Sequence, residues 1–259
     1  MYKPRYLLAV LVTLFIFISC CRQEEPRAKY VFYFVGDGMG LAQAIAAEAY
    51  QSSLSDDEYI PLSFRRFPVT GLINTYAANQ FTTGSAAAGT ALATGNKTSI
   101  NRIGLDPEGK EPFQSIALKA KNRGMKVGII SSVSIDHATP AAFYAHQPDR
   151  NMYFEIGLDL AASSFDFFGG GGFLKPDGIV GGDSVNLYAL AIENGYRYIN
   201  TKEDFHELKP ADEKVLFVNP RLTSGASMYY AIDQPEDYIT LADLTSKAIE
   251  YLDNENGFL

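Results

Sequence analysis

Short apolar runs that alternate with helical segments constrain the fold of this chain more than any other feature. The runs at 30–35, 125–133, 165–173 and 214–219 are rich in Val, Ile, Phe and Gly, which is typical of strands buried on both faces. Helical patterns lie between them and are long enough for parallel crossovers. The sequence therefore predicts an α/β fold, a three-layer sandwich with a central, mostly parallel sheet.

The remaining elements are expected to continue this alternation. Further strands are expected at 67–76 and 196–200, and Pro112 and Gly124 should bound one of the helices. The helices are expected at 41–51, 85–95, 112–124, 139–147, 151–164, 185–195 and 239–253. Because no repeat, linker or change of composition interrupts the pattern, we expect one domain at 29–259.

Residues 1–21 are expected to form a signal segment outside the fold. The positively charged MYKPRY precedes an apolar run, and the small Ser19 stands before Cys20. This pattern indicates export in a bacterium, to the periplasm or as a membrane-anchored lipoprotein lipidated at Cys20. Ordinary cleavage and a plain membrane anchor are the alternatives. Both cysteines, Cys20 and Cys21, lie at this junction, so metal ligands in the body must be oxygen or nitrogen atoms.

The charge balance excludes one class of partner. With 22 Lys and Arg against 30 Asp and Glu, the chain has a net charge of −8 and no basic stripe. Such a chain is a poor nucleic-acid binder, although a local cation site can still bind small phosphate compounds.

Asp37 stands between glycines in VGDGMG, at the end of the first apolar run. The functional interpretation is a metal-binding carboxylate, because Gly36 and Gly38 allow close approach. A nucleotide-binding loop fits less well because its glycine spacing is different. The structural alternative is a carboxylate that only caps the next helix.

Ser85 follows Gly84 in TTGSAAAG and begins a predicted helix. Backbone N–H groups at a helix start favour an anion, so Ser85 is a candidate nucleophile towards a phosphoryl group. An ordinary N-cap serine is the structural alternative. The lipase-type G-x-S-x-G elbow is absent, since Ala87 replaces its second glycine, and the Pro and Arg of a sulfatase-type site are absent too.

The stretch SIDHATPAAFYAHQPDR contains His137, Thr139 and Arg150. His137 and Thr139 could offer ligand atoms from one loop, and the planar guanidinium of Arg150 could hold two phosphoryl oxygens. A capping threonine and a surface arginine are the structural alternatives. For His146 and His206 a purely structural role is favoured.

These stretches occur together, in this order, in the alkaline phosphatases. GDGMG, TxxSAAAGTALATG and HATPAAFYAHxxxR resemble that family, and the resemblance extends over 30–259. It implies an enzyme that hydrolyses phosphate monoesters through a phosphoserine, with two Zn²⁺ and one Mg²⁺ per site. It also suggests a homodimer.

The resemblance assigns a role to each matching residue. Asp37 resembles the carboxylate shared by a zinc and the magnesium, and Ser85 resembles the nucleophile, which also contacts zinc. Thr139 resembles a magnesium ligand, and Arg150 the arginine that holds the phosphate. His137 stands where some members have Asp and others His, so its contact with magnesium could be direct or through water.

The chain departs from the family at two points. Gly84 replaces an Asp that orients the phosphate-binding arginine in most members. The later zinc-binding segments, E-G-x-x-I-D-x-x-x-H and its successors, are absent, and the chain has three His in all. We therefore expect a fragment with negligible activity by itself. A non-catalytic phosphate-binding lipoprotein and a phosphodiesterase or sulfatase of the same superfamily are the alternatives.

Overall fold

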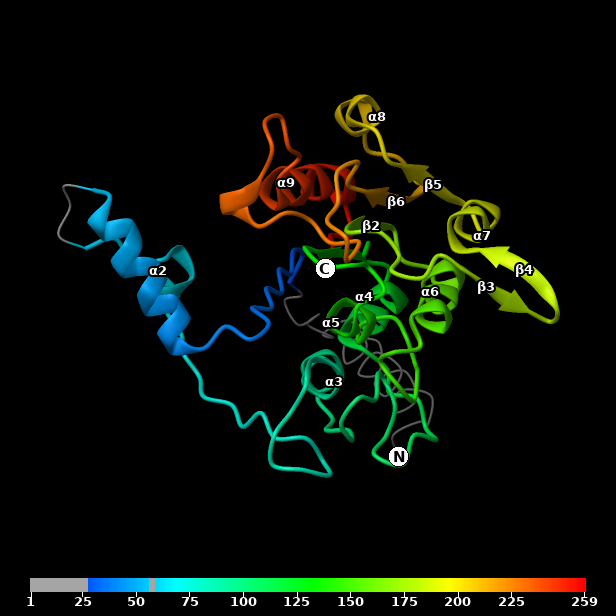
Figure 1. Ribbon diagram of the computed structural model, residues 1–259, viewed down its shortest axis with the longest axis horizontal. Coiled ribbons are helices and arrows are strands. Elements are labelled where there is room, and N and C mark those ends of the chain that lie inside the picture. The colour runs from blue at the N-terminus through cyan, green and yellow to red at the C-terminus, as the bar shows by residue number, and fades with distance from the viewer. Residues whose placement is uncertain (1–27, 56–58) are drawn as a thin grey trace, which may run out of the picture. The chain divides into compact units, whose positions relative to one another are not determined.

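The computed structural model describes residues 28–55 and 59–259 (Figure 1). The chain divides into two compact units, Met1–Val31 and Phe32–Leu259. The expected signal segment, with Cys20, lies outside the described residues. None of the described helices is both long and apolar enough to cross a membrane. The second unit contains every helix and strand discussed below.

Four parallel strands form the central sheet, which confirms the predicted fold class. Their order is β1-β2-β6-β5, with bounds Gly128–Ser131, Phe167–Gly170, Lys214–Val218 and Tyr196–Ile199. Gly128 lies opposite Phe167, which lies opposite Val215 on the next strand. All four residues of β2 are buried, as expected for a strand covered on both faces.

Alternate residues of the strands enter two cores, one on each face of the sheet. Phe168 and Leu216 belong to one core, whereas Phe167 and Phe217 belong to the other. The helices from α4 (Ile116–Asn122) to α7 (Leu187–Glu193) contribute to the first core, and α8 (Lys202–Glu207) and α9 (Leu241–Leu252) contribute to the second. Because strand side chains alternate with a period of two, the sheet is the middle layer of a three-layer sandwich.

The described residues contain eight α-helices and two short 3₁₀ turns. They are α2 (Leu41–Ser53), α3 (Ser85–Thr94), α4 (Ile116–Asn122), α5 (Ala138–Ala141), α6 (Tyr153–Ala162), α7 (Leu187–Glu193), α8 (Lys202–Glu207) and α9 (Leu241–Leu252), with short 3₁₀ turns at Ser63–Arg66 and Ala231–Asp233. The predicted helix at 112–124 begins only at Ile116, because the Ser115 hydroxyl accepts a hydrogen bond from the Leu118 N–H and caps the first turn.

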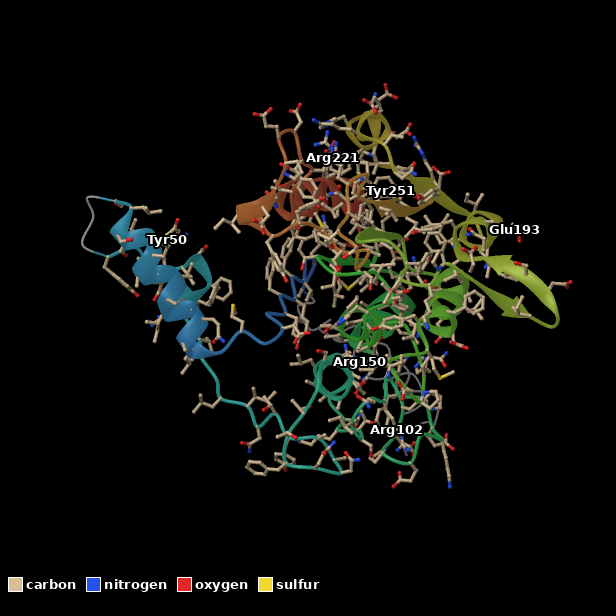
Figure 2. The ribbon with its side chains drawn as sticks, in the orientation of Figure 1. Tyr50, Arg102, Arg150, Glu193, Arg221 and Tyr251 are labelled. Atoms are coloured by element: carbon tan, nitrogen blue, oxygen red, sulfur yellow. The ribbon has the colours of Figure 1, made fainter. Side chains whose placement is uncertain are left out.

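Two predicted strands, at 30–35 and 67–76, are wrong for the described residues. Their side chains are largely exposed, with Phe34 76% exposed and Leu72 fully exposed. Many side chains of α2 are exposed as well, and one of them is Tyr50 (Figure 2). A strand needs a partner for its backbone groups, and the apolar pattern of a segment cannot supply that partner. A hairpin of β3 (Asp177–Val180) and β4 (Asp183–Asn186), together with α8, was not predicted.

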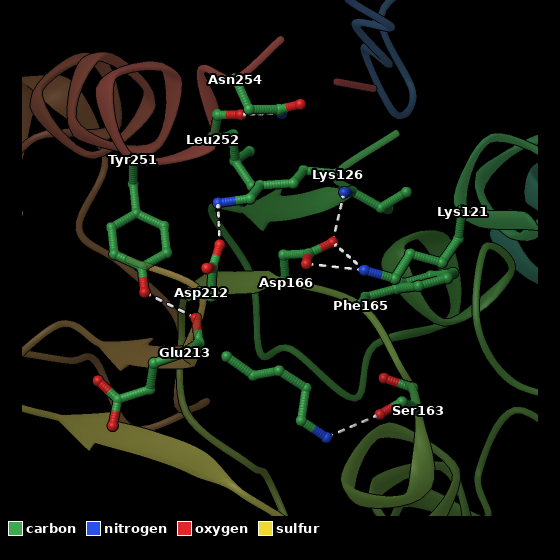
Figure 3. Close-up of polar contacts among 12 residues, drawn as sticks. Lys121, Lys126, Ser163, Phe165, Asp166, Asp212, Glu213, Tyr251, Leu252 and Asn254 are labelled. Carbon is green, nitrogen blue, oxygen red and sulfur yellow. Dashed lines mark hydrogen bonds and ion pairs between the residues drawn. The ribbon is translucent and has the colours of Figure 1, made fainter. Parts of the chain in front are cut away.

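Asp166, just before β2, ties two elements together (Figure 3). Its carboxylate accepts hydrogen bonds from the Lys121 Nζ at 2.7 Å and from the Val127 N–H at 2.8 Å. Both charged side chains are mostly buried, so removing one partner leaves the other poorly solvated. We expect Asp166→Ala to lower the free energy of unfolding by about 2–3 kcal/mol in urea titrations.

Asp212 provides the matched control for this substitution. Its carboxylate lies 3.8 Å from the Lys126 Nζ, but its side chain is fully exposed. Since exposed ion pairs contribute little, Asp212→Ala should leave the urea midpoint almost unchanged. Equal effects of the two substitutions would contradict the assignment of Asp166 as a structural link.

Candidate active site

Asp37 is the point at which three distant segments meet. It lies in a turn that follows the irregular residues 31–36, and Gly38 adopts a left-handed conformation with φ of +67°. The Asp37 Oδ2 accepts hydrogen bonds from the Ser85 Oγ and from the Thr139 Oγ1, each at 2.8 Å. One carboxylate oxygen therefore joins two hydroxyls that sequence analysis selected as candidate site residues.

Ser85 is the first residue of α3, not its N-cap. The N-cap is Gly84, and the Ser85 hydroxyl is directed to Asp37 instead of to the helix backbone. The structural interpretation as an ordinary capping serine is therefore wrong. The side chain is partly exposed at the start of a ten-residue helix, where backbone N–H groups favour a negatively charged ligand.

The small residues after Ser85 serve mainly to pack α3 against the rest of the fold. Ala86, Ala87 and Gly89 are buried, and a Cβ atom at Gly89 would lie 3.1 Å from the Ala142 Cβ just after α5. Close approach of these two helices requires side chains of this size. This packing holds Ser85 and Thr139 at a fixed separation, because each lies on one of the two helices.

His137 and Arg150 form a second pair. The Arg150 Nη2 lies 3.0 Å from the His137 Nε2, and the guanidinium can only donate. His137 is therefore neutral, with its proton on Nδ1. Burial lowers the pKa of His137 and the positive charge of Arg150 lowers it further, whereas Asp37 opposes them. In this arrangement neither ring nitrogen offers a free lone pair.

Asp136 is a buried residue that sequence analysis missed. Its Oδ2 accepts a hydrogen bond from the Leu174 N–H at 2.8 Å, and burial raises the pKa of the carboxyl group. The Asp136 Oδ1 and the His137 Nδ1 are the buried side-chain atoms that lack a hydrogen-bond partner among the described residues. The sequence signal was an acidic residue directly before a histidine at a strand end.

The loop that carries these residues is anchored in the core. The Tyr144 hydroxyl donates to the Ile135 carbonyl at 2.6 Å, and its ring packs edge-on against Phe168 of β2. The Ile135 N–H donates in turn to the Gly172 carbonyl at 3.0 Å, within the glycine-rich segment after β2. The side chain of Tyr144 is buried in the first core, so it anchors the loop to that core.

The donor atoms fit a single hard cation better than a zinc pair. Asp37, Ser85 and Thr139 supply a carboxylate and two hydroxyls, which are ligands that Mg²⁺ accepts. Over the ranges 28–55 and 59–259, no group of three or more His, Cys, Asp and Glu side chains is gathered closely enough to hold a metal ion. Zinc favours such nitrogen and carboxylate clusters, so the described residues do not fit two zinc ions.

The other two histidines make contacts typical of structural residues. The His146 Nε2 lies 3.0 Å from the Phe113 carbonyl, and the His146 N–H donates to the Asp159 Oδ2. His206 lies on α8, with its ring edge-on to Phe205. These contacts agree with the purely structural roles that sequence analysis favoured for His146 and His206.

Several known proteins with related sequences are alkaline phosphatases. A family model described as alkaline phosphatase matches residues 28–166. Alkaline phosphatase 4 of Bacillus subtilis (strain 168) is 32% identical over 250 residues, which cover 93% of this chain and 52% of that protein. Streptomycin-6-phosphate phosphatase of Streptomyces griseus is 29% identical over 205 residues, or 73% of this chain and 44% of that protein.

Solved structures agree with these sequence matches. The cold-active alkaline phosphatase of a psychrophilic Shewanella sp. superposes with a TM-score of 0.73 at 32% identity, over 86% of this chain and 53% of that one. The alkaline phosphatase of the Antarctic bacterium TAB5 gives 0.68 at 27% identity, over 86% and 60%. The chain spans about half the length of the curated relatives that it matches. The family model, the sequence relatives and the solved structures together show that the chain belongs to the alkaline phosphatase family.

Proposed function

We propose that this chain carries the nucleophile half of a phosphomonoesterase site, with Ser85 as the nucleophile. The observation that supports this proposal is the hydrogen bond from the Ser85 hydroxyl to Asp37, beside a second hydroxyl from Thr139. Because the serine proton points to Asp37, the lone pairs of Oγ are free to meet phosphorus. The family to which the chain belongs supports the same assignment.

The proposed chemistry is an in-line displacement followed by hydrolysis. The Ser85 hydroxyl passes its proton to Asp37, and the bond from its Oγ to phosphorus forms as the bond to the leaving oxygen breaks. This step gives phosphoserine and, once the proton reaches the leaving oxygen, a free alcohol. Water then cleaves the phosphoserine and gives inorganic phosphate and the Ser85 hydroxyl. Arg150 would place its donors on the equatorial phosphoryl oxygens. Asp37 and Thr139, with Ser85, would hold Mg²⁺, whose charge stabilises the negative charge that develops on the phosphoryl group.

The proposal also includes what sequence analysis inferred about the activity of the chain alone, its export and its assembly. The chain alone should have negligible turnover, because the described residues do not fit the zinc pair of the family. Export, lipidation at Cys20 and a homodimer are proposed on the signal pattern and the family resemblance. A non-catalytic phosphate-binding role is the second candidate, favoured by Asp37 and Arg150 together with the lack of such a metal-binding cluster in the part of the chain that the structure describes.

Binding of inorganic phosphate to the chain in the presence of Mg²⁺ tests the assignment of Arg150. We expect Arg150→Ala to weaken binding about tenfold to a hundredfold in isothermal titration calorimetry, since hydrogen bonds to charged groups contribute about 1.5–3 kcal/mol. Arg123→Ala, on an exposed residue at the end of α4, should leave the affinity unchanged. Equal affinities of the two variants would remove Arg150 from the proposed phosphate site.

His137 is the position at which magnesium binding should be adjustable. Two variants of the TAB5 enzyme, in which a histidine is replaced by Glu or by Asp, are described with Mg bound in a site called M3. A carboxylate is a harder ligand than imidazole, so we expect His137→Asp to tighten Mg²⁺ binding by this chain about tenfold. Calorimetric titration with Mg²⁺ measures this change. His146→Asp is the control, and an equal gain there would show only a general effect of added charge.

A further inference from the structure

A cavity of about 300 Å³ lies between α4, the chain that follows α5, and the end of α6 (Figure 1). None of the residues that we assign to the candidate active site lines it. Its volume is at the lower end of the range of small-molecule sites, so it suits a small ligand. The residues that matter for its chemistry are Leu118, Phe143, His146, Asp159, Ala162 and Phe165.

The polar groups in the walls of this cavity are held by contacts within the protein. The Ser115 Oγ donates to the Phe143 carbonyl at 2.6 Å and accepts from the Leu118 N–H at 3.1 Å. The His146 Nε2 lies 3.0 Å from the Phe113 carbonyl. Because these contacts fix the walls, the cavity is formed before any ligand enters, and binding does not have to order it.

One oxygen of Asp159 is left open in this arrangement. The Asp159 Oδ2 accepts hydrogen bonds from the His146 N–H at 3.0 Å and from the Gln147 Nε2 at 2.8 Å. The Oδ1 accepts none from the described residues, and it is not one of their buried unpartnered atoms, so solvent reaches it. Ser164 also lines the cavity and is exposed. The cavity therefore contains a carboxylate oxygen that two fixed donors position and that no protein group occupies.

The charge around the cavity favours a cation. Asp159 is the one carboxylate among the described residues that line it, and neither Lys nor Arg is present there. A metal ion would lack further ligands, because the part of the chain that the structure describes has no group of three or more His, Cys, Asp and Glu side chains close enough to hold one. Apolar walls from Leu118, Phe143 and Phe165 instead suit an organic body, and aromatic rings also attract cations.

We propose that this cavity binds a small organic ammonium ion. Its N–H groups donate to the Asp159 Oδ1, and its apolar body lies against Leu118 and Phe143. A neutral apolar compound fits less well, because it would desolvate the carboxylate without supplying a partner, and an anion would be repelled. The site is separate from the phosphoryl chemistry and does not depend on the proposed function.

The probe for this cavity is 2-phenylethylammonium, which joins a primary ammonium to one aromatic ring. Its neutral counterpart, 2-phenylethanol, and the anion 3-phenylpropionate are the matched controls. Isothermal titration calorimetry with the full chain should show saturable binding of the ammonium. We expect binding of both controls to be at least tenfold weaker, because hydrogen bonds between two charged groups are stronger than those to a neutral hydroxyl.

The substitution Asp159→Asn tests the position of the charge. The asparagine carbonyl can still accept from the His146 N–H and the Gln147 Nε2, but the amide group then replaces the open carboxylate oxygen. We expect it to weaken 2-phenylethylammonium binding at least tenfold. Asp183→Asn, at an exposed position of β4, changes the net charge equally and should leave the affinity unchanged. Circular dichroism verifies that both variants fold.

A second pair of variants tests the location through volume alone. Ala162 is the last residue of α6, lines the cavity and is exposed, so a larger side chain there does not disturb the core. We expect Ala162→Phe to fill the cavity and to weaken binding of 2-phenylethylammonium at least tenfold. Ala162→Ser keeps the size of the side chain and should bind the probe like the wild type.

Any of four results would overturn the proposal. The first two concern the wild-type chain, namely no saturable binding of 2-phenylethylammonium, or binding of 2-phenylethanol or 3-phenylpropionate that is as tight. The other two are wild-type affinity in Asp159→Asn and wild-type affinity in Ala162→Phe. Because the comparison of the three probes uses the unaltered chain, it decides the matter even where a variant fails to fold.

Discussion

In the phosphomonoesterase that we propose contains this chain, replacing Ser85 with alanine should lower kcat/KM for p-nitrophenyl phosphate by about 10³-fold or more. Loss of a nucleophile removes the covalent route and leaves only the stabilisation supplied by the rest of the site, and such losses reach about 10⁶-fold in other enzymes. The hydroxyl of Ser85 donates to Asp37, and no other atom of that side chain can attack phosphorus. Acid quenching with ³²P-labelled substrate should trap phosphoserine in the wild type but not in the variant.

The matched control for Ser85→Ala lies at the other end of the same helix. The Thr94 hydroxyl donates to the Thr90 carbonyl, within α3, so Thr94→Ala removes a hydroxyl without touching the site. Its kcat/KM should remain within about twofold of the wild type, as is usual for substitutions away from functional features. Labelled phosphoenzyme that persists in Ser85→Ala would assign the nucleophile to another residue.

The second large effect is expected at Gly170, the last residue of β2. Its φ of +135° lies in a region that is open essentially only to glycine, and a Cβ atom there would lie 1.8 Å from the Ser131 carbonyl oxygen. Gly170→Ala must therefore separate β2 from β1 at the carboxyl ends of these strands. We expect the free energy of unfolding to fall by about 4 kcal/mol or more, measured by urea denaturation and near-UV circular dichroism.

Gly124→Ala is the control that separates the cost of the backbone conformation from the cost of steric overlap. Gly124 has a φ of +83°, but no atom lies within 4 Å of the position that its Cβ would take. Gly124→Ala should therefore cost only the left-handed conformation, about 1–2 kcal/mol. If Gly170→Ala lowers the free energy of unfolding no more than Gly124→Ala does, then separating β1 from β2 at this point costs little free energy.

The sheet was predictable from the sequence where strands are buried on both faces. The runs that became β1, β2 and β6 are nearly continuous in apolar residues, and this pattern indicates a central parallel strand. The run at 30–35 has the same pattern but forms no strand among the described residues, because strand formation depends on a neighbouring strand and not on the run itself. The hairpin of β3 and β4 is exposed and polar, so it carried no signal of this kind.

Candidate site residues could be selected from the sequence, but the contacts between them could not. The carboxyl ends of parallel strands share one edge of a sheet, which led to Thr139 and His137 after β1. The pairing of His137 with Arg150 could not be foreseen, because it depends on where the chain turns after α5. Asp136 was missed because the sequence does not distinguish a buried aspartate from an exposed one.

The buried hydroxyl of Tyr144 couples the conformation of the site loop to the packing of the core. Because it supports the Ile135 carbonyl while its ring lies against Phe168, the loop with His137 and Thr139 cannot swing outward unless an aromatic ring leaves the core. Opening of this loop and melting of the sandwich are then one cooperative event. Access to Ser85 must be governed by other segments, and this side of the site stays rigid for as long as the protein is folded.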